Sequence, residues 1–171
     1  MIFPFGFLGG SYTPSTEALA WKTRIESNGG IIPTPTLQIF DRELITPAVA
    51  AGIWSELDRL NVYCGLNGFE IAARTNLIKN AHYVTPVSSP IFNNNGYASG
   101  GTGYLNLNYN FATQAVKFTR DSAIFGYCAF NPTFSGSPRP MGSLGGGSSR
   151  NDCERDANGS TGSVNTSGGL S

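Results

Sequence analysis

The chain has 171 residues, with 11 basic and 11 acidic residues and no formal net charge. This length allows one medium domain, or a small helical unit followed by one β-domain. Only 13% of the residues are charged, so the chain lacks the basic surface with which proteins bind nucleic acid or anionic lipid. Its 22 glycines and many Asn, Ser and Thr residues are typical of β-rich proteins, including secreted and virion proteins.

The first 12 residues form an apolar arm that contains Phe3, Phe5, Phe7 and Leu8. The arm does not resemble a signal peptide, because it lacks a basic start and a cleavage site, and a proline and a glycine interrupt it. No apolar run approaches the roughly 20 residues that span a bilayer. General export and membrane insertion are therefore not expected. The four side chains either pack on the chain's own helices or, as we predict for a docking arm, bury themselves in a partner.

Residues 13–64 predict a region of short helices. Three Thr-Pro pairs, at 13–14, 34–35 and 46–47, each place a helix-capping threonine before a proline suited to the first helical position. The first helix is expected to stop at Asn28-Gly29-Gly30, and the second at Pro47.

The third helix is expected to carry the clearest apolar stripe of the chain: Ala50, Ile53, Trp54, Leu57 and Leu60. Helices below ~12–15 residues are marginal in isolation. They must pack on each other, on the β-domain or on neighbouring subunits, with Trp21 and Trp54 as core residues.

Residues 70–171 predict a partial antiparallel β-sandwich. The period-two pattern begins at Ile71 and Ala73, and predicted strands follow over 83–92, 93–97, 100–109, 115–119 and 122–130. Spacings of ~8–12 residues with turn residues between strands are typical of a sandwich. Alternation of Leu105, Leu107 and Tyr109 with asparagines predicts one buried and one solvated face. The fold class is therefore α+β, with short N-terminal helices before the sandwich.

The segment from about residue 135 is rich in Gly and Ser and offers few apolar residues for further strands. A complete jelly roll needs more strands than residues 70–130 supply. Either the chain is the N-terminal part of a longer protein, or another subunit completes the sandwich. The pattern at Gly168–Ser171 favours the longer protein.

Several motifs resemble a set of tailed-bacteriophage structural proteins. The resemblance rests on residues 74–82, on Pro86–Phe92, on Gly96-Tyr97, on Gly100–Leu107 and on Ser122–Tyr127, and extends over roughly residues 18–130. In that family the β-domain is a concanavalin-like (laminin-G-like) jelly roll. The resemblance implies a virion protein of the fibre, spike or decoration type, without indicating its position on the particle.

No catalytic or metal site is predicted, and no cofactor. Glu154 and Asp156 resemble the paired carboxylates of glucanases built on the same jelly roll, but Asn158 stands where those enzymes add a third carboxylate, and the surrounding Gly/Ser-rich strip is expected to be flexible. Such a strip offers no apolar wall to raise the pKa of a catalytic acid. His82, the only histidine, has no nucleophile motif to serve.

The cysteines also argue against a metal site. Cys64, Cys128 and Cys153 are widely spaced, odd in number and form no C-x-x-C pair. Three free thiols are expected, with one bridge and a leftover cysteine as the alternative. A zinc site made with the single histidine is not expected.

Two functions remain open. In the first, the chain is a virion structural protein, a homo-oligomer (a trimer if it is a fibre), anchored by its N-terminal region and displaying a β-domain that binds host glycan. In the second, it is a cellular carbohydrate-binding or laminin-G-like adhesion module, which the missing signal peptide disfavours. The candidate glycan residues are Asn94, Tyr97, Tyr104 and Asn106, although strand aromatics more often belong to a core.

Overall fold

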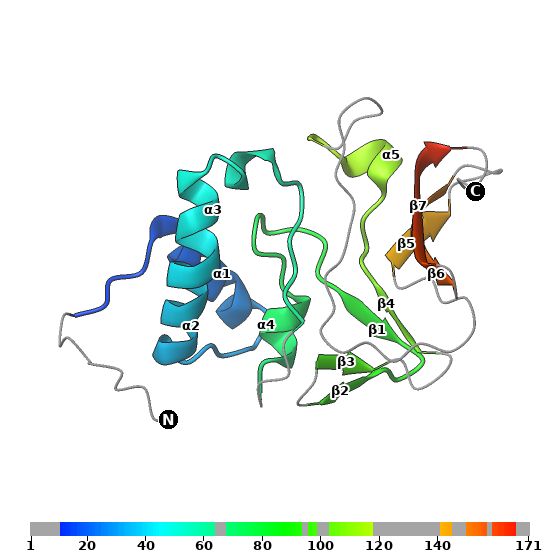
Figure 1. Ribbon diagram of the computed structural model, residues 1–171. Helices are drawn as coiled ribbons and strands as arrows, with labels where there is room; N and C mark the ends of the chain where they lie inside the picture. The colour runs from blue at the N-terminus through cyan, green and yellow to red at the C-terminus, as the bar shows by residue number, and fades with distance from the viewer. Residues whose placement is uncertain are drawn as a thin grey trace, which may run out of the picture. The chain divides into compact units, whose positions relative to one another are not determined.

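The computed structural model describes residues 11–63, 68–93, 96–98, 103–117, 141–144, 150–156 and 159–166. It divides into two compact units, Met1–Tyr109 and Asn110–Ser171. The described residues are α+β, as the sequence predicts. The helical elements of the first unit are α1 (Thr16–Ser27), α2 (Thr34–Phe40), the π-turn η1 (Asp41–Ile45), α3 (Thr46–Ala50), the 3-10 turn η2 (Trp54–Glu56) and α4 (Glu70–Arg74) (Figure 1).

Helix α1 begins two residues later than the Thr-Pro pair predicts. Its N-cap is Ser15, whose Oγ accepts a hydrogen bond from the Ala18 backbone N–H at 3.2 Å. The predicted end is confirmed, because Asn28 is the C-cap and Gly29 follows with φ of 80°. Glycine adopts this left-handed conformation without the steric cost that a Cβ atom brings.

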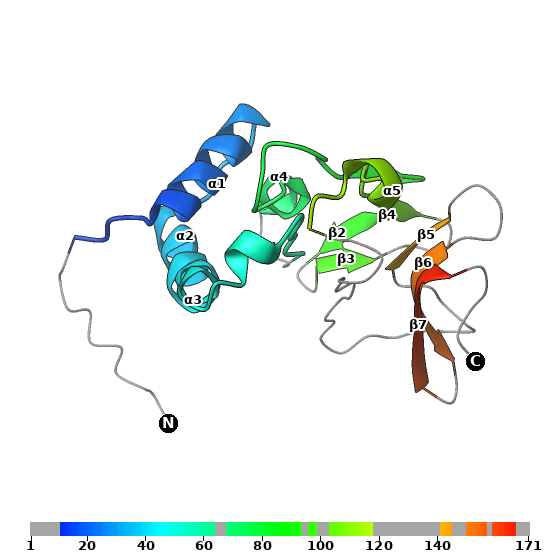
Figure 2. The same cartoon turned by 90° about the horizontal axis from the view of Figure 1, so that it is seen from above.

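Helices α2 and α3 form one continuous column through the π-turn, so the prediction that Pro47 ends the second helix is wrong (Figures 1 and 2). The backbone N–H of Thr46 donates to the carbonyl of Asp41, a bond from residue i+5 to residue i. A regular helix breaks at proline because the ring meets the carbonyl of the preceding turn. The wider π-turn just before Pro47 relieves that contact.

The predicted third helix is also wrong beyond Ala50. Gly52 has φ of 72° and ends the helix, and of residues 53–60 only the 3-10 turn η2 is helical. Leu57 is already extended, with ψ of 131°. The five-residue stripe therefore does not lie on one helix face: Ile53 is 55% exposed, whereas Trp54 and Leu60 pack against the core from irregular chain.

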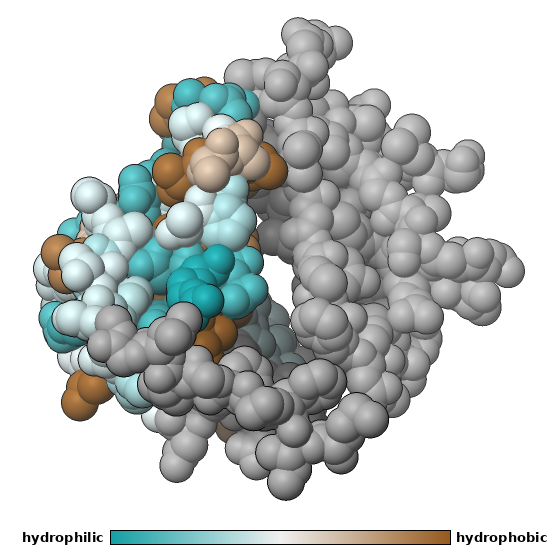
Figure 3. Space-filling view, turned by 60° about the vertical axis from the view of Figure 1, so that its left-hand side comes forward, coloured by the Kyte–Doolittle hydropathy of each residue, from teal (hydrophilic) through white to brown (hydrophobic). Residues whose placement is uncertain are grey.

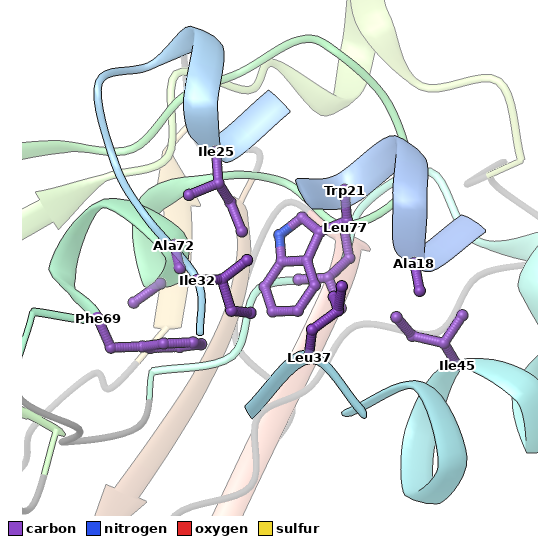
Figure 4. Close-up of a cluster of buried hydrophobic side chains, with 10 residues drawn as sticks. Ala18, Trp21, Ile25, Ile32, Leu37, Ile45, Phe69, Ala72 and Leu77 are labelled. Carbon is purple, nitrogen blue, oxygen red and sulfur yellow. The ribbon is translucent and has the colours of Figure 1, made fainter. Parts of the chain in front are cut away.

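The first unit has one hydrophobic core, built mostly from its helices. Trp21 and Ile25 of α1 meet Leu37 of α2 and Ile45 of η1, and α4 closes the cluster with Ala72 (Figure 4). The Trp21 ring makes edge contacts with Phe40, with centroids 5.5 Å apart, and with Phe69, at 6.1 Å. Trp21 is fully buried and Trp54 partly buried, which confirms the prediction that both belong to the core.

Asp41, at the start of the π-turn, is a buried carboxylate with four hydrogen-bond donors. Its Oδ2 accepts from the Tyr12 hydroxyl at 2.9 Å and from the Ser15 backbone N–H at 2.8 Å. Its Oδ1 accepts from the Ser15 hydroxyl at 2.7 Å and from the Thr46 hydroxyl at 2.9 Å. Burial acts to raise the pKa of Asp41, but these bonds outweigh it and hold the pKa below its usual value. The carboxylate thus joins the start of α1 to the α2–α3 column.

Residues 70–74 are helical, so the strand predicted to begin at Ile71 and Ala73 is wrong. The buried residues Phe69, Ala72 and Ala73 are spaced three and four apart, which places them on one helix face. Over so few residues, period two and period 3.6 are difficult to distinguish.

The strands of the first unit pair into two small antiparallel sheets. Strand β1 (Thr85–Val87) pairs with β4 (Tyr104–Asn106), and β2 (Ile91–Asn93) with β3 (Gly96–Ala98). The single strand predicted over 83–92 is interrupted because Ser88 and Ser89 both have positive φ, 56° and 53°. Along 104–110, half-buried Leu105, Leu107 and Tyr109 alternate with exposed residues, which confirms the predicted two-faced pattern.

The second unit contains a short helix and a three-stranded sheet. Helix α5 spans Phe111–Gln114, and strands β5 (Met141–Leu144), β6 (Arg150–Asp156) and β7 (Gly159–Thr166) pair antiparallel in the order β5-β6-β7. The Gly/Ser-rich segment thus supplies strands that the sequence did not predict. Residues 115–117 are not in a strand, contrary to expectation, and the strand predicted over 122–130 lies outside the described residues.

Gly30 marks the closest approach between the end of α1 and α4, and it gives a first testable prediction. A Cβ atom there would lie 2.5 Å from Cγ2 and 2.7 Å from Cβ of Ile71. Because Ile71 is β-branched and cannot easily turn away, we expect Gly30→Ala to lower the free energy of unfolding by about 1–3 kcal/mol.

The neighbouring Gly29 supplies the control, because a Cβ atom added there would have no other atom within 4 Å, and its φ of 80° suits asparagine. Urea unfolding followed by circular dichroism should therefore show a smaller loss of the free energy of unfolding for Gly29→Asn than for Gly30→Ala. An equal loss for both variants would contradict the close packing at Gly30.

Candidate functional site

The described glycan-binding candidates lie on the two small sheets, but they are not equally available. Tyr104 on β4 is 54% exposed, and Asn106 is exposed two residues further on. Tyr97 on β3 is half-buried: its ring lies 6.0 Å from that of Phe92, and its hydroxyl donates to the Gly103 carbonyl at 2.8 Å. Burial raises the pKa of Tyr97. Tyr97 therefore belongs to the packing of the sheets, and Asn94 lies outside the described residues.

The predicted docking residues Phe3, Phe5, Phe7 and Leu8 lie outside the described residues as well. The carboxylate pair, Glu154 and Asp156, lies within the described residues. Glu154 and Asp156 lie on β6, in register with Thr161 and Gly159 of β7, so these positions belong to a strand where the sequence predicted none. Regular hydrogen bonding between neighbouring strands, which glycine and serine residues permit, accounts for the difference.

A polar pocket in the first unit is the candidate binding site that the sequence did not predict. Its volume is about 170 Å³, and it lies between the end of α1 and the loop that follows α4. Three basic side chains line it, Arg24, Lys79 and His82, and no carboxylate does. The other lining residues are Asn28, Thr75, Asn76, Asn80, Ala81 and Tyr83. The pocket is therefore lined by basic, amide and hydroxyl groups.

Asn76 fixes the loop that shapes the pocket. Its side chain is 1% exposed, and its Oδ1 accepts hydrogen bonds from the backbone N–H groups of Ile78, at 3.0 Å, and Leu60, at 3.3 Å. Its Nδ2 donates to the carbonyl of Ala81 at 3.4 Å. A buried amide with these partners holds the loop in one conformation, since leaving any of them unpaired is costly.

Arg24 positions the loop from the helix side and keeps an uncompensated charge. Its Nε donates to the carbonyl of Asn76 at 3.2 Å, and its Nη2 donates to the carbonyl of Leu77. Among the described residues no carboxylate forms an ion pair with Arg24. Burial lowers the pKa of Arg24, as expected for a cation that has lost water without gaining an anion.

Lys79 and His82 complete the basic lining. The Nζ of Lys79 lies 3.6 Å from the Asp58 carboxylate and 5.8 Å from the centre of the Tyr109 ring. His82 Nδ1 lies 2.8 Å from the Asn108 carbonyl, so this nitrogen carries the hydrogen and donates it. His82 and Asn108 both have positive φ, 61° and 50°.

Asn108 holds this strained corner in place. Its Nδ2 donates to the carbonyl of Tyr83 at 2.7 Å and to the hydroxyl of Thr85 at 2.8 Å. Strained, non-glycine left-handed residues persist only where surrounding contacts fix them, and they are enriched at functional sites. The rim of the pocket at His82 is therefore pre-organised.

Comparisons of the chain with protein-family models, with characterised proteins and with solved structures find no match. In the described parts of the chain, no helix has the length and apolar character needed to cross a bilayer. Nor do those parts bring together three or more His, Cys, Asp or Glu side chains that could hold a metal ion.

Proposed function

We propose that this chain is a structural protein of a bacteriophage virion, of the head- or tail-fibre, spike or decoration type, and not an enzyme. Its N-terminal arm and helical unit attach it to other virion proteins, and it assembles as a homo-oligomer, a trimer if it forms a fibre. The β-region is displayed as a jelly roll and contacts glycan on the host surface. The sequence motifs at residues 74–107 are the basis for the class of protein.

The observation that carries the proposal is the set of apolar side chains exposed on the helical unit, by which we mean the helices α1 to α4 of the first unit with the turns η1 and η2. This unit already has a closed core, yet five large aliphatic residues remain at its surface: Leu19 (52% exposed), Ile31 (75%), Ile39 (61%), Val49 (39%) and Ile53 (55%). Figure 3 shows apolar residues, in brown, beside polar ones on the described part of one face.

Exposed aliphatic side chains support assembly because water disfavours them. Burying one completely contributes roughly 1.5–3 kcal/mol before the costs of association are subtracted. The apolar arm, with its three phenylalanines, directly precedes this unit in the chain. Both features support an attachment role for residues 1–64.

Deleting residues 1–10 tests the proposal, and we expect the protein to be lost from assembled particles. The deletion removes the four large apolar side chains of the arm but keeps Tyr12 and Ser15, which bind Asp41, so the helical unit should still fold. The measurement is quantitative mass spectrometry of purified particles, together with circular dichroism of the isolated variant.

A full-length variant with Phe3, Phe5, Phe7 and Leu8 replaced by serine separates the loss of apolar contacts from the loss of chain length. Wild-type levels of this variant in particles would refute docking through the arm. Absence of the wild-type protein from purified particles would refute the virion role itself.

A further inference from the structure

The geometry points to the polar pocket between α1 and residues 75–83 as a binding site for the carboxylate-bearing sugar of an acidic saccharide. This site is separate from the tyrosines of the small sheets. The inference rests on the proposed function in one respect only, which is that the saccharide belongs to a host-surface glycan.

The charge of the pocket selects an anion. Arg24, Lys79 and His82 line it without any Asp or Glu. Asp58, which does not line the pocket, pairs with Lys79 at 3.6 Å, so the unopposed charge is that of Arg24. A ligand carboxylate would supply the counter-charge that Arg24 lacks among the described residues. Bonds between ionised partners are shorter and stronger than neutral ones, so this contact would dominate the affinity.

Donor atoms remain for such a ligand. Arg24 uses its Nε–H and one N–H of Nη2 to hold the loop, which leaves three of its five N–H groups without a partner among the described residues. Lys79 has three donors and one carboxylate partner, Asp58 at 3.6 Å. Because the backbone and Asn76 already hold the loop, little order would have to be gained on binding.

The neutral groups of the pocket favour a sugar over a bare inorganic anion. The side chain of Asn80 has no hydrogen-bond partner among the described residues and is exposed at the pocket's edge. Asn28 spends one donor on Thr75 Oγ1, at 3.1 Å, and its other groups are available. Planar amides that both donate and accept match the hydroxyl groups of a sugar ring, whereas phosphate would use only donors.

The size of the pocket suits one terminal sugar. Its volume of about 170 Å³ is several times the ~30 Å³ that one water molecule occupies in the liquid. One saccharide residue can occupy a space of this size and present further residues of the glycan to solvent. The arrangement is therefore that of a site for the end of a glycan chain.

A titration of the full-length protein, followed by ¹H–¹⁵N NMR, tests the inference with sodium glucuronate, glucose and inorganic phosphate as probes. We expect glucuronate to shift the side-chain amide signals of Asn28 and Asn80 and the backbone signals of residues 79–83 at the lowest concentration. Equal or tighter binding of glucose would overturn the role of the carboxylate. Equal or tighter binding of phosphate would overturn the role of the sugar, and no shift at these residues would overturn the site.

Two matched lysine variants place the ligand in the pocket. Lys79→Gln removes one lining cation and should weaken glucuronate binding about fivefold, a modest loss because Lys79 is partly solvated. Lys22→Gln is the control: Lys22 has nearly the same exposure (32% against 33%) and is also paired to a carboxylate, but it does not line the pocket. Equal affinities of the two variants would contradict the assignment.

The Asn80 side chain has no hydrogen-bond partner among the described residues, so Asn80→Ala breaks no bond that holds the loop there. We expect this variant to weaken the binding of glucuronate more than the binding of phosphate. The outcome is independent of virion assembly. If glucuronate fails to bind but the protein is present in particles, the pocket assignment falls and the virion role stands. If glucuronate binds but the protein is absent from particles, the pocket assignment stands and the virion role falls.

Discussion

Replacing Trp21 by alanine is expected to lower the free energy of unfolding of the helical unit by about 3–5 kcal/mol. The side chain is fully buried in the core and contacts the rings of Phe40 and Phe69, which themselves stack with centroids 5.4 Å apart. The substitution would remove the largest fully buried side chain of the described residues and leave a cavity among α1, the α2–α3 column and α4 (Figure 4). The loss is a large share of the roughly 5–15 kcal/mol that stabilises a typical domain.

Urea unfolding of the full-length protein, monitored by circular dichroism, measures this effect. Leu19→Ala is the matched control, because Leu19 lies on the same helix but is 52% exposed. We expect the control to differ from wild type by less than about 0.5 kcal/mol. A loss of less than about 1 kcal/mol for Trp21→Ala would show that the three helices do not share this core.

Asp41→Asn is expected to have the second large effect and to lower the free energy of unfolding by about 3 kcal/mol. Asparagine keeps one acceptor oxygen but turns an NH₂ group toward the donors of the other: either the Tyr12 hydroxyl and the Ser15 backbone N–H, or the Ser15 and Thr46 hydroxyls. Hydrogen bonds to a charged group contribute about 1.5–3 kcal/mol each, and a buried donor left unpaired costs more than the bond alone. Glu43→Gln, at an exposed position two residues on, is the control.

The same carboxylate makes stability depend on pH in a defined direction. Because the folded pKa of Asp41 is below the ordinary value, the folded protein binds this proton less readily than the unfolded chain does. Its stabilisation is fully present above the unfolded pKa of about 3.9 and is lost as pH falls through the folded value. We expect urea unfolding to show a smaller difference in the free energy of unfolding between wild type and Asp41→Asn at pH 3 than at pH 7. An equal difference at both pH values would contradict an ionised Asp41 in the folded protein.

Local signals predict part of the fold well. Asn28-Gly29 ends α1 where the sequence indicates, because a left-handed C-terminal residue is determined by its own backbone. The alternation along 104–110 is likewise a local pattern, of which Tyr104–Asn106 lie in strand β4. The jelly roll, in contrast, depends on long-range pairing and stays a prediction.

The errors occur where two local signals compete. Ala50, Ile53, Trp54, Leu57 and Leu60 have helical spacing, yet Gly52 lies within the pattern and takes φ of 72°. Pro47 has the sequence signature of a helix end, but a π-turn accommodates it. A glycine inside a periodic stretch thus carries more weight than the apolar residues around it.

The pocket could not be predicted, because its parts are distant in sequence. Arg24 and Asn28 lie about 50 residues before the loop that holds Lys79 and His82. One signal is present in the sequence: residues 75–83 contain several polar and basic residues and no acidic one. Only the packing of α1 beside α4 shows that this loop faces a basic helix end.

The π-turn also sets the tolerance of this segment to changes in chain length. A π-turn is equivalent to a regular helix with one extra residue, and it places Thr46 directly above Asp41 so that their side chains meet at 2.9 Å. In an α-helix, residues five apart lie about 140° apart around the axis. A one-residue deletion between 41 and 45 would thus restore a regular helix and keep Thr46 near Asp41, at i+4, but it would bring Pro47 against the preceding turn. This part of the chain is therefore expected to accept substitutions more readily than insertions or deletions.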